Sequence, residues 1–238
     1  MDAHVLITGN SSGIGRAFTE QYLARGAQVY GLSRRGFGGQ HARLHDIRCD
    51  LGRLELIPTA LDALLDGVTR LDLVLLNAGI LGEIRELHQT SMESIERVMA
   101  INVWANKVLL DWLIAQRIEV GQIVLISSGA AVVGGKGWGA YSLSKATLNM
   151  LTQLYAHEFP NSHLSAVAPG LVDTAMQDYL CDEKTVDGER YPSLQRLRAA
   201  RGSDAMPQPG DAAARIIGQL ERIRREMPSG AFVDIRDL

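Results

Sequence analysis

The sequence predicts a single α/β domain built on a doubly wound, mostly parallel sheet of seven strands, with helices on both faces. Short apolar segments alternate with helical segments along the chain, which is typical of parallel strands joined by helices. The chain has 238 residues, and α/β domains of this length often remain undivided. A glycine-rich turn directly after the first apolar segment supports the same fold, because it opens the helix that follows.

The first half of the chain is expected to form four strands and the helices between them. The run at 71–76 is almost continuously apolar, as expected of a strand buried on both faces. Gly26 is a stop signal for the first helix, and Pro58 suits the first turn of the second. Thr90 and Glu93 fit a capping box at the start of a long third helix. The expected strands are 3–7, 28–32, 43–48 and 71–76.

The second half continues the alternation and adds a lid. Residues 175–206 are polar and irregular, with few apolar anchors, and are expected to form a lid of short helices. No repeat or linker divides the chain, so residues 1–238 are expected to form one domain that includes this lid. The remaining strands are expected at 122–126, 163–168 and 231–235, and the remaining helices at about 140–158 and 211–225.

Composition excludes several classes of protein. The formal net charge is −3 with acids and bases interspersed, which argues against nucleic acid or an anionic membrane as a partner. Cys49 and Cys181 are the two cysteines, so neither a disulfide framework nor a cysteine-based metal site is expected, and no metal is predicted. The N-terminus lacks a basic leader pattern, and no apolar run reaches spanning length, so a cytoplasmic location is expected.

The best candidate for chemistry follows the fifth expected strand. Tyr141 and Lys145 are four residues apart, so a helix places them on one face. A free tyrosine is a poor acid–base catalyst near neutrality, but a neighbouring ammonium favours the phenolate and lowers its pKa. Together with the hydroxyl of Ser128, these groups suit proton transfer to a carbonyl oxygen. The alternative is an ordinary amphipathic pair whose polar ends reach solvent.

Two further residues are candidates for the same site. Asn102 falls inside an expected helix, where asparagine is intrinsically unfavourable. It is either a solvent-facing residue or a polar group that the site needs. Trp138 lies three residues before Tyr141 and is a candidate for lining a substrate pocket.

In order and spacing, these motifs resemble the short-chain dehydrogenase/reductase family over nearly the whole chain. Thr8-Gly9-x-x-x-Gly13-x-Gly15 is similar to the cofactor turn of the family, and Asn77-Ala78-Gly79 is similar to most of its Asn-Asn-Ala-Gly element. The resemblance implies a Rossmann domain that binds NAD(P). It implies cofactor contacts by Gly9, Ser11, Ser12, Gly13, Ile14, Gly15, Ser33, Arg34, Asp50, Leu51, Asn77, Ala78, Gly79, Tyr141, Lys145, Pro169, Gly170, Val172 and Thr174.

The resemblance also implies a catalytic tetrad of Asn102, Ser128, Tyr141 and Lys145. Tyr141 would donate the proton, Lys145 would lower the pKa of Tyr141 and hold the nicotinamide ribose, and Ser128 would hydrogen-bond the carbonyl oxygen. Asn102 would hold a water that links Lys145 to solvent. Ser128, Trp138 and Tyr141 are the expected substrate contacts.

The chain departs from the family pattern at two points. Leu76 replaces the first asparagine of the Asn-Asn-Ala-Gly element, and residues 233–236 lack the Val-Asp-Gly-Gly of many members. The second departure puts in doubt the subunit interface that this segment forms in relatives. Within the family, the chain is most similar to carbonyl reductases of the sepiapterin reductase and benzil reductase type.

The end of the second expected strand predicts the choice of cofactor. In dinucleotide-binding folds an acid near this point binds the ribose 2′-hydroxyl and repels a 2′-phosphate. No carboxylate is present here, Ser33 stands where NAD-using relatives carry aspartate, and Arg34 follows. A guanidinium suits bidentate contact with a phosphate, so NADP(H) is expected. The alternative is that Arg34 and Arg35 are surface charges on a loop.

The resulting expectation is an NADPH-dependent oxidoreductase that reduces a ketone or diketone to an alcohol. The alternative is an NAD(P)-binding regulatory or signalling protein on the same fold, because fold does not determine function. The expected partners are a small carbonyl or alcohol substrate and further copies of the chain. By resemblance, a homodimer or homotetramer would pair through the helices at about 91–117 and 140–158.

Overall fold

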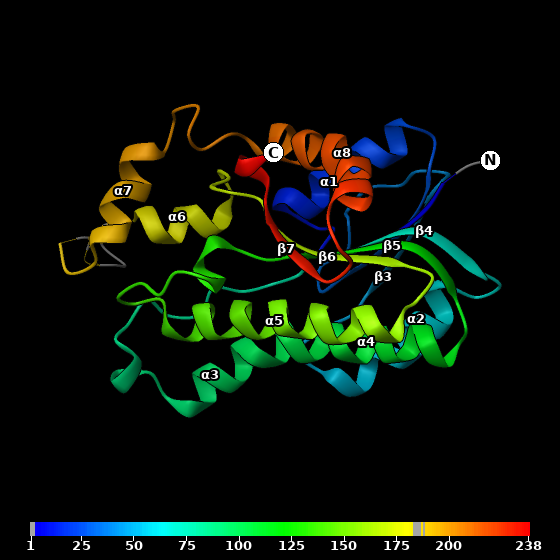
Figure 1. The fold of residues 1–238 in the computed structure, drawn as a ribbon, viewed down its shortest axis with the longest axis horizontal. Coiled ribbons are helices and arrows are strands. Elements are labelled where there is room, and N and C mark those ends of the chain that lie inside the picture. The colour runs from blue at the N-terminus through cyan, green and yellow to red at the C-terminus, as the bar shows by residue number, and fades with distance from the viewer. Residues whose placement is uncertain (1–2, 183–186, 188) are drawn as a thin grey trace.

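The sheet has seven strands in the order β3-β2-β1-β4-β5-β6-β7 in the computed structural model, which describes residues 3–182, 187 and 189–238 (Figure 1). Every neighbouring pair is parallel, which confirms the predicted doubly wound fold. The strands are β1 His4–Thr8, β2 Gln28–Ser33, β3 Leu44–Arg48, β4 Arg70–Leu76, β5 Glu119–Ile126, β6 His163–Ala168 and β7 Ala231–Asp234. The helices are α1 Gly13–Ala24, α2 Ile57–Leu64, α3 Met92–Met99, α4 Ala105–Ala115, α5 Gly139–Glu158, α6 Ala175–Cys181, α7 Pro192–Ala200 and α8 Pro209–Glu226.

Helices cover both faces of this sheet. Helices α1 and α8 lie on one face, and α2, α4 and α5 lie on the other (Figure 1). Successive side chains of a strand point to opposite faces, so in β1 Leu6 joins one apolar cluster while Val5 and Ile7 join the other. Burial on both faces explains why the central strands are nearly continuous apolar runs.

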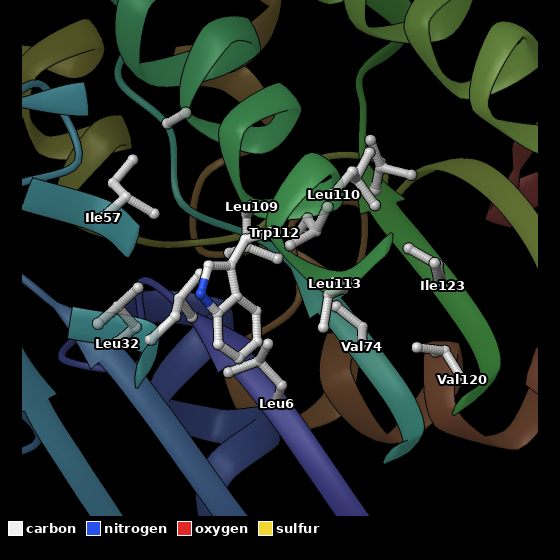
Figure 2. Packing of buried hydrophobic residues seen from close by; sticks show 14 of the residues in the cluster. Leu6, Leu32, Ile57, Val74, Leu109, Leu110, Trp112, Leu113, Val120 and Ile123 are labelled. Carbon is white, nitrogen blue, oxygen red and sulfur yellow. The ribbon is translucent and has the colours of Figure 1, made fainter. Parts of the chain in front are cut away.

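Helix α4 provides a large share of the packing on its face of the sheet. Figure 2 shows Leu109, Trp112 and Leu113 of α4 among Leu6 and Val74 of the central strands. The Trp112 indole also donates a hydrogen bond to Asp62 Oδ1 at 2.9 Å, which ties α4 to α2.

The long helix expected from about residue 91 differs from its prediction in two respects. Its N-cap is Ser91, whose hydroxyl accepts from the Ser94 amide at 3.2 Å. Thr90 instead donates to the Glu86 carbonyl, so the predicted Thr90–Glu93 capping box is wrong by one position. The helix also widens into a π-helical segment, Ala100–Trp104, between α3 and α4. Such π-bulges often occur at functional sites, and this one contains Asn102.

The lid is better anchored than the sequence predicted. Helices α6 and α7 pack together, and Leu180, Leu194 and Leu197 are buried in an apolar cluster with Leu81 and Ile84 of the loop after β4. The expectation of few apolar anchors was wrong, because these leucines are sparse in sequence and converge only when the two helices meet. Residues 183–186 and 188 of the expected lid lie outside the described residues.

One segment, Met92–Ala115, is long and apolar enough to span a membrane by length and composition. This differs from the expectation that no run reaches that length. Half of its most apolar window is buried inside the fold, and Leu109 and Leu113 lie in the main core. Its hydropathy is therefore that of a helix packed against the sheet.

Candidate active site

The carboxyl ends of the strands open into a cavity of about 420 Å³. Its walls come from the segments that follow β1, β2, β3, β4, β5 and β6. Open parallel sheets bind their ligands at this edge, where the strand order reverses. In this sheet the reversal lies between β1 and β4.

The turn between β1 and α1 forms one wall of the cavity. Gly9 and Gly13 have φ angles of +71° and +56°, which glycine adopts without strain. A Cβ on Gly15 would lie 2.4 Å from the Gly9 carbonyl oxygen, so this glycine is required for packing rather than for lining the cavity. The N-cap of α1, Ser12, makes no side-chain cap. The first amides of this helix therefore suit binding of a pyrophosphate.

Thr8 joins this turn to the segment after β4. Its hydroxyl accepts hydrogen bonds from the amides of Asn77 and Ala78 at 3.0 and 3.1 Å. Asn77 Nδ2 in turn donates to the Thr8 carbonyl at 3.1 Å. The expected Asn77-Ala78-Gly79 element is thus held against the glycine turn by hydrogen bonds between side chains and backbone, which fix its local geometry.

The end of β2 brings a buried hydroxyl and two cations to the cavity. Ser33 is 3% exposed, and its Oγ has no hydrogen-bond partner among the described residues. Arg34 and Arg35 are exposed and line the cavity beside it. Arg35 donates to Ser12 Oγ at 2.9 Å, so it already reaches the N-terminus of α1. An unpartnered hydroxyl with two guanidinium groups suits a phosphate.

Tyr141 and Lys145 project from the first turns of α5 toward Ser128, which follows β5. The Ser128 hydroxyl lies beside the phenol of Tyr141 and favours its ionised form, and Lys145 Nζ lies 5.7 Å from the centre of the Tyr141 ring. Lys145 is 3% exposed and donates to the Ile126 carbonyl at 2.7 Å. The structure thus brings the three expected groups together.

Burial controls the ionisation of this pair. It raises the pKa of Tyr141 above 10, and the hydrogen bond from Ser128 only partly offsets this. Burial also lowers the pKa of Lys145 to about 8. The net direction for Tyr141 is therefore opposite to the expected lowering by Lys145, because desolvation disfavours both charged forms. A phenol that keeps its proton is suited to act as an acid.

Asn102 is fully buried and does not line the cavity. Its amide exchanges two hydrogen bonds with the backbone of Ile80, at 2.8 and 2.9 Å, and donates a third to Ser144 Oγ at 2.9 Å. Ser144 donates to the Tyr141 carbonyl at 2.7 Å. The π-helical segment thereby fastens the loop after β4 to the helix that carries Tyr141. The solvent-facing alternative for Asn102 is wrong.

One end of the cavity lies under the lid. Trp138 is close to Tyr141, with ring centres 6.0 Å apart, and its indole donates to Ser193 Oγ of α7 at 2.7 Å. Met176 and Leu197 of the lid line the same end. These neighbours make this end largely apolar.

Apart from Gly15 and Asn102, every expected site residue lines this one cavity. Sequence reasoning missed several lining residues. Arg35 could have been predicted, because it directly follows Arg34 in the basic pair after β2. The lid contributors follow no readable motif. The missed lining residues are Arg35, Cys49, Ile80, Ile101, Ile126, Ser127, Leu171, Ala175, Met176, Gln177, Leu180 and Leu197.

The sequence profile of the short chain dehydrogenase family matches residues 3–185. The chain therefore belongs to this family of oxidoreductases, whose members bind a nicotinamide cofactor and act on small molecules. The chain is 30% identical over 248 residues to benzil reductase ((S)-benzoin forming) of Bacillus subtilis (strain 168), with 98% of each chain covered. It is 29% identical over 257 residues to sepiapterin reductase of Mus musculus, with 98% of this chain and 96% of that one covered.

Solved structures agree with this assignment. The KRED1-Pglu enzyme superposes with a TM-score of 0.85 at 25% identity, with 97% of this chain and 100% of that one covered. The predicted family resemblance and fold class are confirmed.

Proposed function

We propose that this protein is an NADPH-dependent reductase that converts a ketone or diketone carbonyl to an alcohol. The observation that carries the proposal is the half-buried Tyr141 phenol, which lines the cavity beside Ser128 and Lys145. The names of two relatives, benzil reductase and sepiapterin reductase, support carbonyl reduction as the reaction.

In this proposal Tyr141 gives its proton to the carbonyl oxygen of the substrate, and Ser128 donates a hydrogen bond to the same oxygen. Because burial raises the pKa of Tyr141, the acid form predominates at neutral pH. Lys145 supplies a positive charge beside the developing tyrosinate and would hold the nicotinamide ribose. A bound nicotinamide supplies the hydride.

The adenosine end supports NADP(H) as the cofactor. Ser33 Oγ has no partner within the described part of the chain, and Arg34 and Arg35 line the cavity next to it. No carboxylate stands at the end of β2 to repel a 2′-phosphate. The adenine ring would lie against Asp50 and Leu51, which line the same end. A cytoplasmic location remains part of the proposal.

Replacement of the acid tests this function. Tyr141→Phe removes one hydroxyl, so NADPH should still bind while ketone reduction falls roughly 10²–10⁴-fold. Tyr155→Phe is a matched control on the same helix, because the Tyr155 hydroxyl bonds Asp111 rather than lining the cavity. Rates come from NADPH oxidation with a panel of ketones and diketones, and binding comes from calorimetry.

Two outcomes count against the proposal. Tyr141→Phe within a factor of a few of wild type would remove Tyr141 from the acid role. NADPH binding without oxidation by any carbonyl would favour the regulatory alternative.

A further inference from the structure

The lid wall of the cavity contains one polar side chain that the proposed chemistry does not use. The residues of α6 and α7 that line the cavity are Ala175, Met176, Gln177, Leu180 and Leu197. Four of these five side chains are apolar. Gln177 lies in the first turn of α6, where its backbone N–H donates to the Thr174 carbonyl at 2.7 Å.

The Gln177 side chain is buried, and its amide oxygen is unsatisfied. The residue is 8% exposed, and its Oε1 has no hydrogen-bond partner among the residues that the structure describes. A buried amide oxygen without a donor costs about 1–3 kcal/mol. Such groups are rare in folded proteins, and each one calls for a physical explanation.

One side-chain donor at the apolar end of the cavity is already in use. The Trp138 indole N–H donates to Ser193 Oγ at 2.7 Å. Met176, Leu180 and Leu197 offer no donor. A ligand in the cavity would supply a hydrogen bond to the Gln177 amide, since this residue lines the cavity and its Oε1 has no partner among the described residues.

We propose that Gln177 selects substrates that carry a hydroxyl on the side facing the lid. This proposal deepens the proposed function, on which it rests, by narrowing the substrate to an apolar ketone with a hydroxyl group. A hydroxyl suits either orientation of the amide, because it donates to the oxygen and accepts from the nitrogen. A cavity wall built to bond a hydroxyl discriminates strongly against analogues that lack it.

The test uses pairs of ketones of equal size that differ in one hydroxyl. One pair is α-hydroxyacetophenone and propiophenone, and the other is para-hydroxyacetophenone and para-methylacetophenone. The two pairs place the hydroxyl at different ends of the molecule. Affinities are measured by calorimetry on the protein loaded with NADP⁺, which has no hydride to give to the ketone.

Gln177→Met is the informative variant, because methionine is similar in volume and adapts to irregular packing. Wild type should prefer the hydroxyl member of at least one pair, and the ratio of the two Kd values should fall roughly tenfold in Gln177→Met. Gln195→Leu, on the exposed side of α7, is the matched control and should retain the wild-type ratio. Thermal unfolding of Gln177→Met should not occur at a lower temperature than wild type, since an unsatisfied group is removed.

Several results overturn the proposal. Equal Kd ratios in wild type and Gln177→Met would do so. A variant that binds NADP⁺ and both members of each pair more weakly would also do so, because Gln177 would then be a cofactor contact. Failure of all four ketones to bind also overturns it. A hydroxyl preference that depends on Gln177, without any reduction in the presence of NADPH, would instead refute the proposed function alone.

Discussion

At the end of β2, Ser33, Arg34 and Arg35 present a buried hydroxyl and two exposed guanidinium groups to the cavity. We expect catalytic efficiency with NADPH to exceed that with NADH by at least about tenfold, which requires only about 1.4 kcal/mol. Arg34→Ala should reduce this preference, and Ser33→Asp should reverse it by repelling the 2′-phosphate. Steady-state kinetics with both cofactors measure the effect.

Salt provides an independent check on the same contact. The contact between the 2′-phosphate and these arginines is ionic and partly exposed. Rising ionic strength should therefore weaken NADPH binding more than NADH binding. Equal efficiency with both cofactors in the unmutated protein would contradict the role given to Ser33 and Arg34.

Lys145 should make ketone reduction depend on pH. Burial lowers the pKa of Lys145 to about 8, so the side chain is an ammonium below that pH and a neutral amine above it. Since the ammonium stabilises the developing tyrosinate, kcat should decline as pH rises through about 8. The measurement is a pH–rate profile with NADPH and one ketone.

Lys145→Arg is the matched variant, because a guanidinium keeps its charge at high pH. The pH–rate profile of Lys145→Arg should not decline above pH 8, whatever the absolute rate of this variant. A wild-type profile that stays flat to well above pH 8 would contradict the assignment of this titration to Lys145.

Among the secondary-structure elements, the lid is also tied to a carboxylate of the loop after β4. Glu86 accepts hydrogen bonds from Arg190 Nε at 2.8 Å and from the Tyr191 hydroxyl at 2.9 Å, and Lys136 Nζ lies 3.6 Å away. The Arg190 guanidinium, with Tyr191, lowers the pKa of Glu86 to about 2. A carboxyl group with a depressed pKa stabilises the fold at pH values above the ordinary pKa of glutamate. This contribution is lost only as the pH falls toward about 2. These contacts therefore persist at neutral pH.

Glu86→Ala should loosen the lid without unfolding the domain. We expect the amides of α7 to exchange with deuterium roughly fivefold faster and the KM for ketones to rise, because α7 loses two hydrogen bonds at its N-terminal end. Glu83→Ala is the control, since Glu83 pairs only with exposed Arg85 in the described structure. Unchanged exchange in α7 would mean that its buried leucines alone hold the lid.

For the whole molecule, the outer side of α5 is an exposed apolar surface. Leu143, Met150 and Leu154 recur on one face of α5 and are 46%, 52% and 55% exposed. Trp104 and Ile114, next to and in α4, are also partly exposed. Helices α4 and α5 lie side by side along the same face of the sheet (Figure 1). This surface supports the proposed pairing of subunits through these helices.

We expect a homodimer or homotetramer by light scattering at micromolar concentration. The double substitution Met150→Glu and Leu154→Glu should shift it to smaller species, because each adds a charge to the apolar contact. Leu56→Glu, at a 38% exposed position before α2, is the control and should leave the mass unchanged. A monomeric wild-type protein would rule out this assembly.

The sequence by itself determined the order of strands and helices, the glycine turn and the Tyr141–Lys145 pair. These features are local: side-chain periodicity, glycine at positive φ and a spacing of four residues are all readable within one segment. The order of the motifs then indicated the family, because several motifs follow one another along the chain in the order and spacing typical of its members.

Only the tertiary structure decided how residues from distant segments affect one another. Asn102 fastens Ile80 to the Tyr141 helix because a π-helical segment turns its amide inward. Burial raises the pKa of Tyr141, and the leucines of α6 and α7 meet in one cluster. Only the fold shows that the buried Gln177 Oε1 lacks a partner among the described residues. Desolvation and hydrogen-bond satisfaction depend on what surrounds an atom in space, and no pattern along the chain records that.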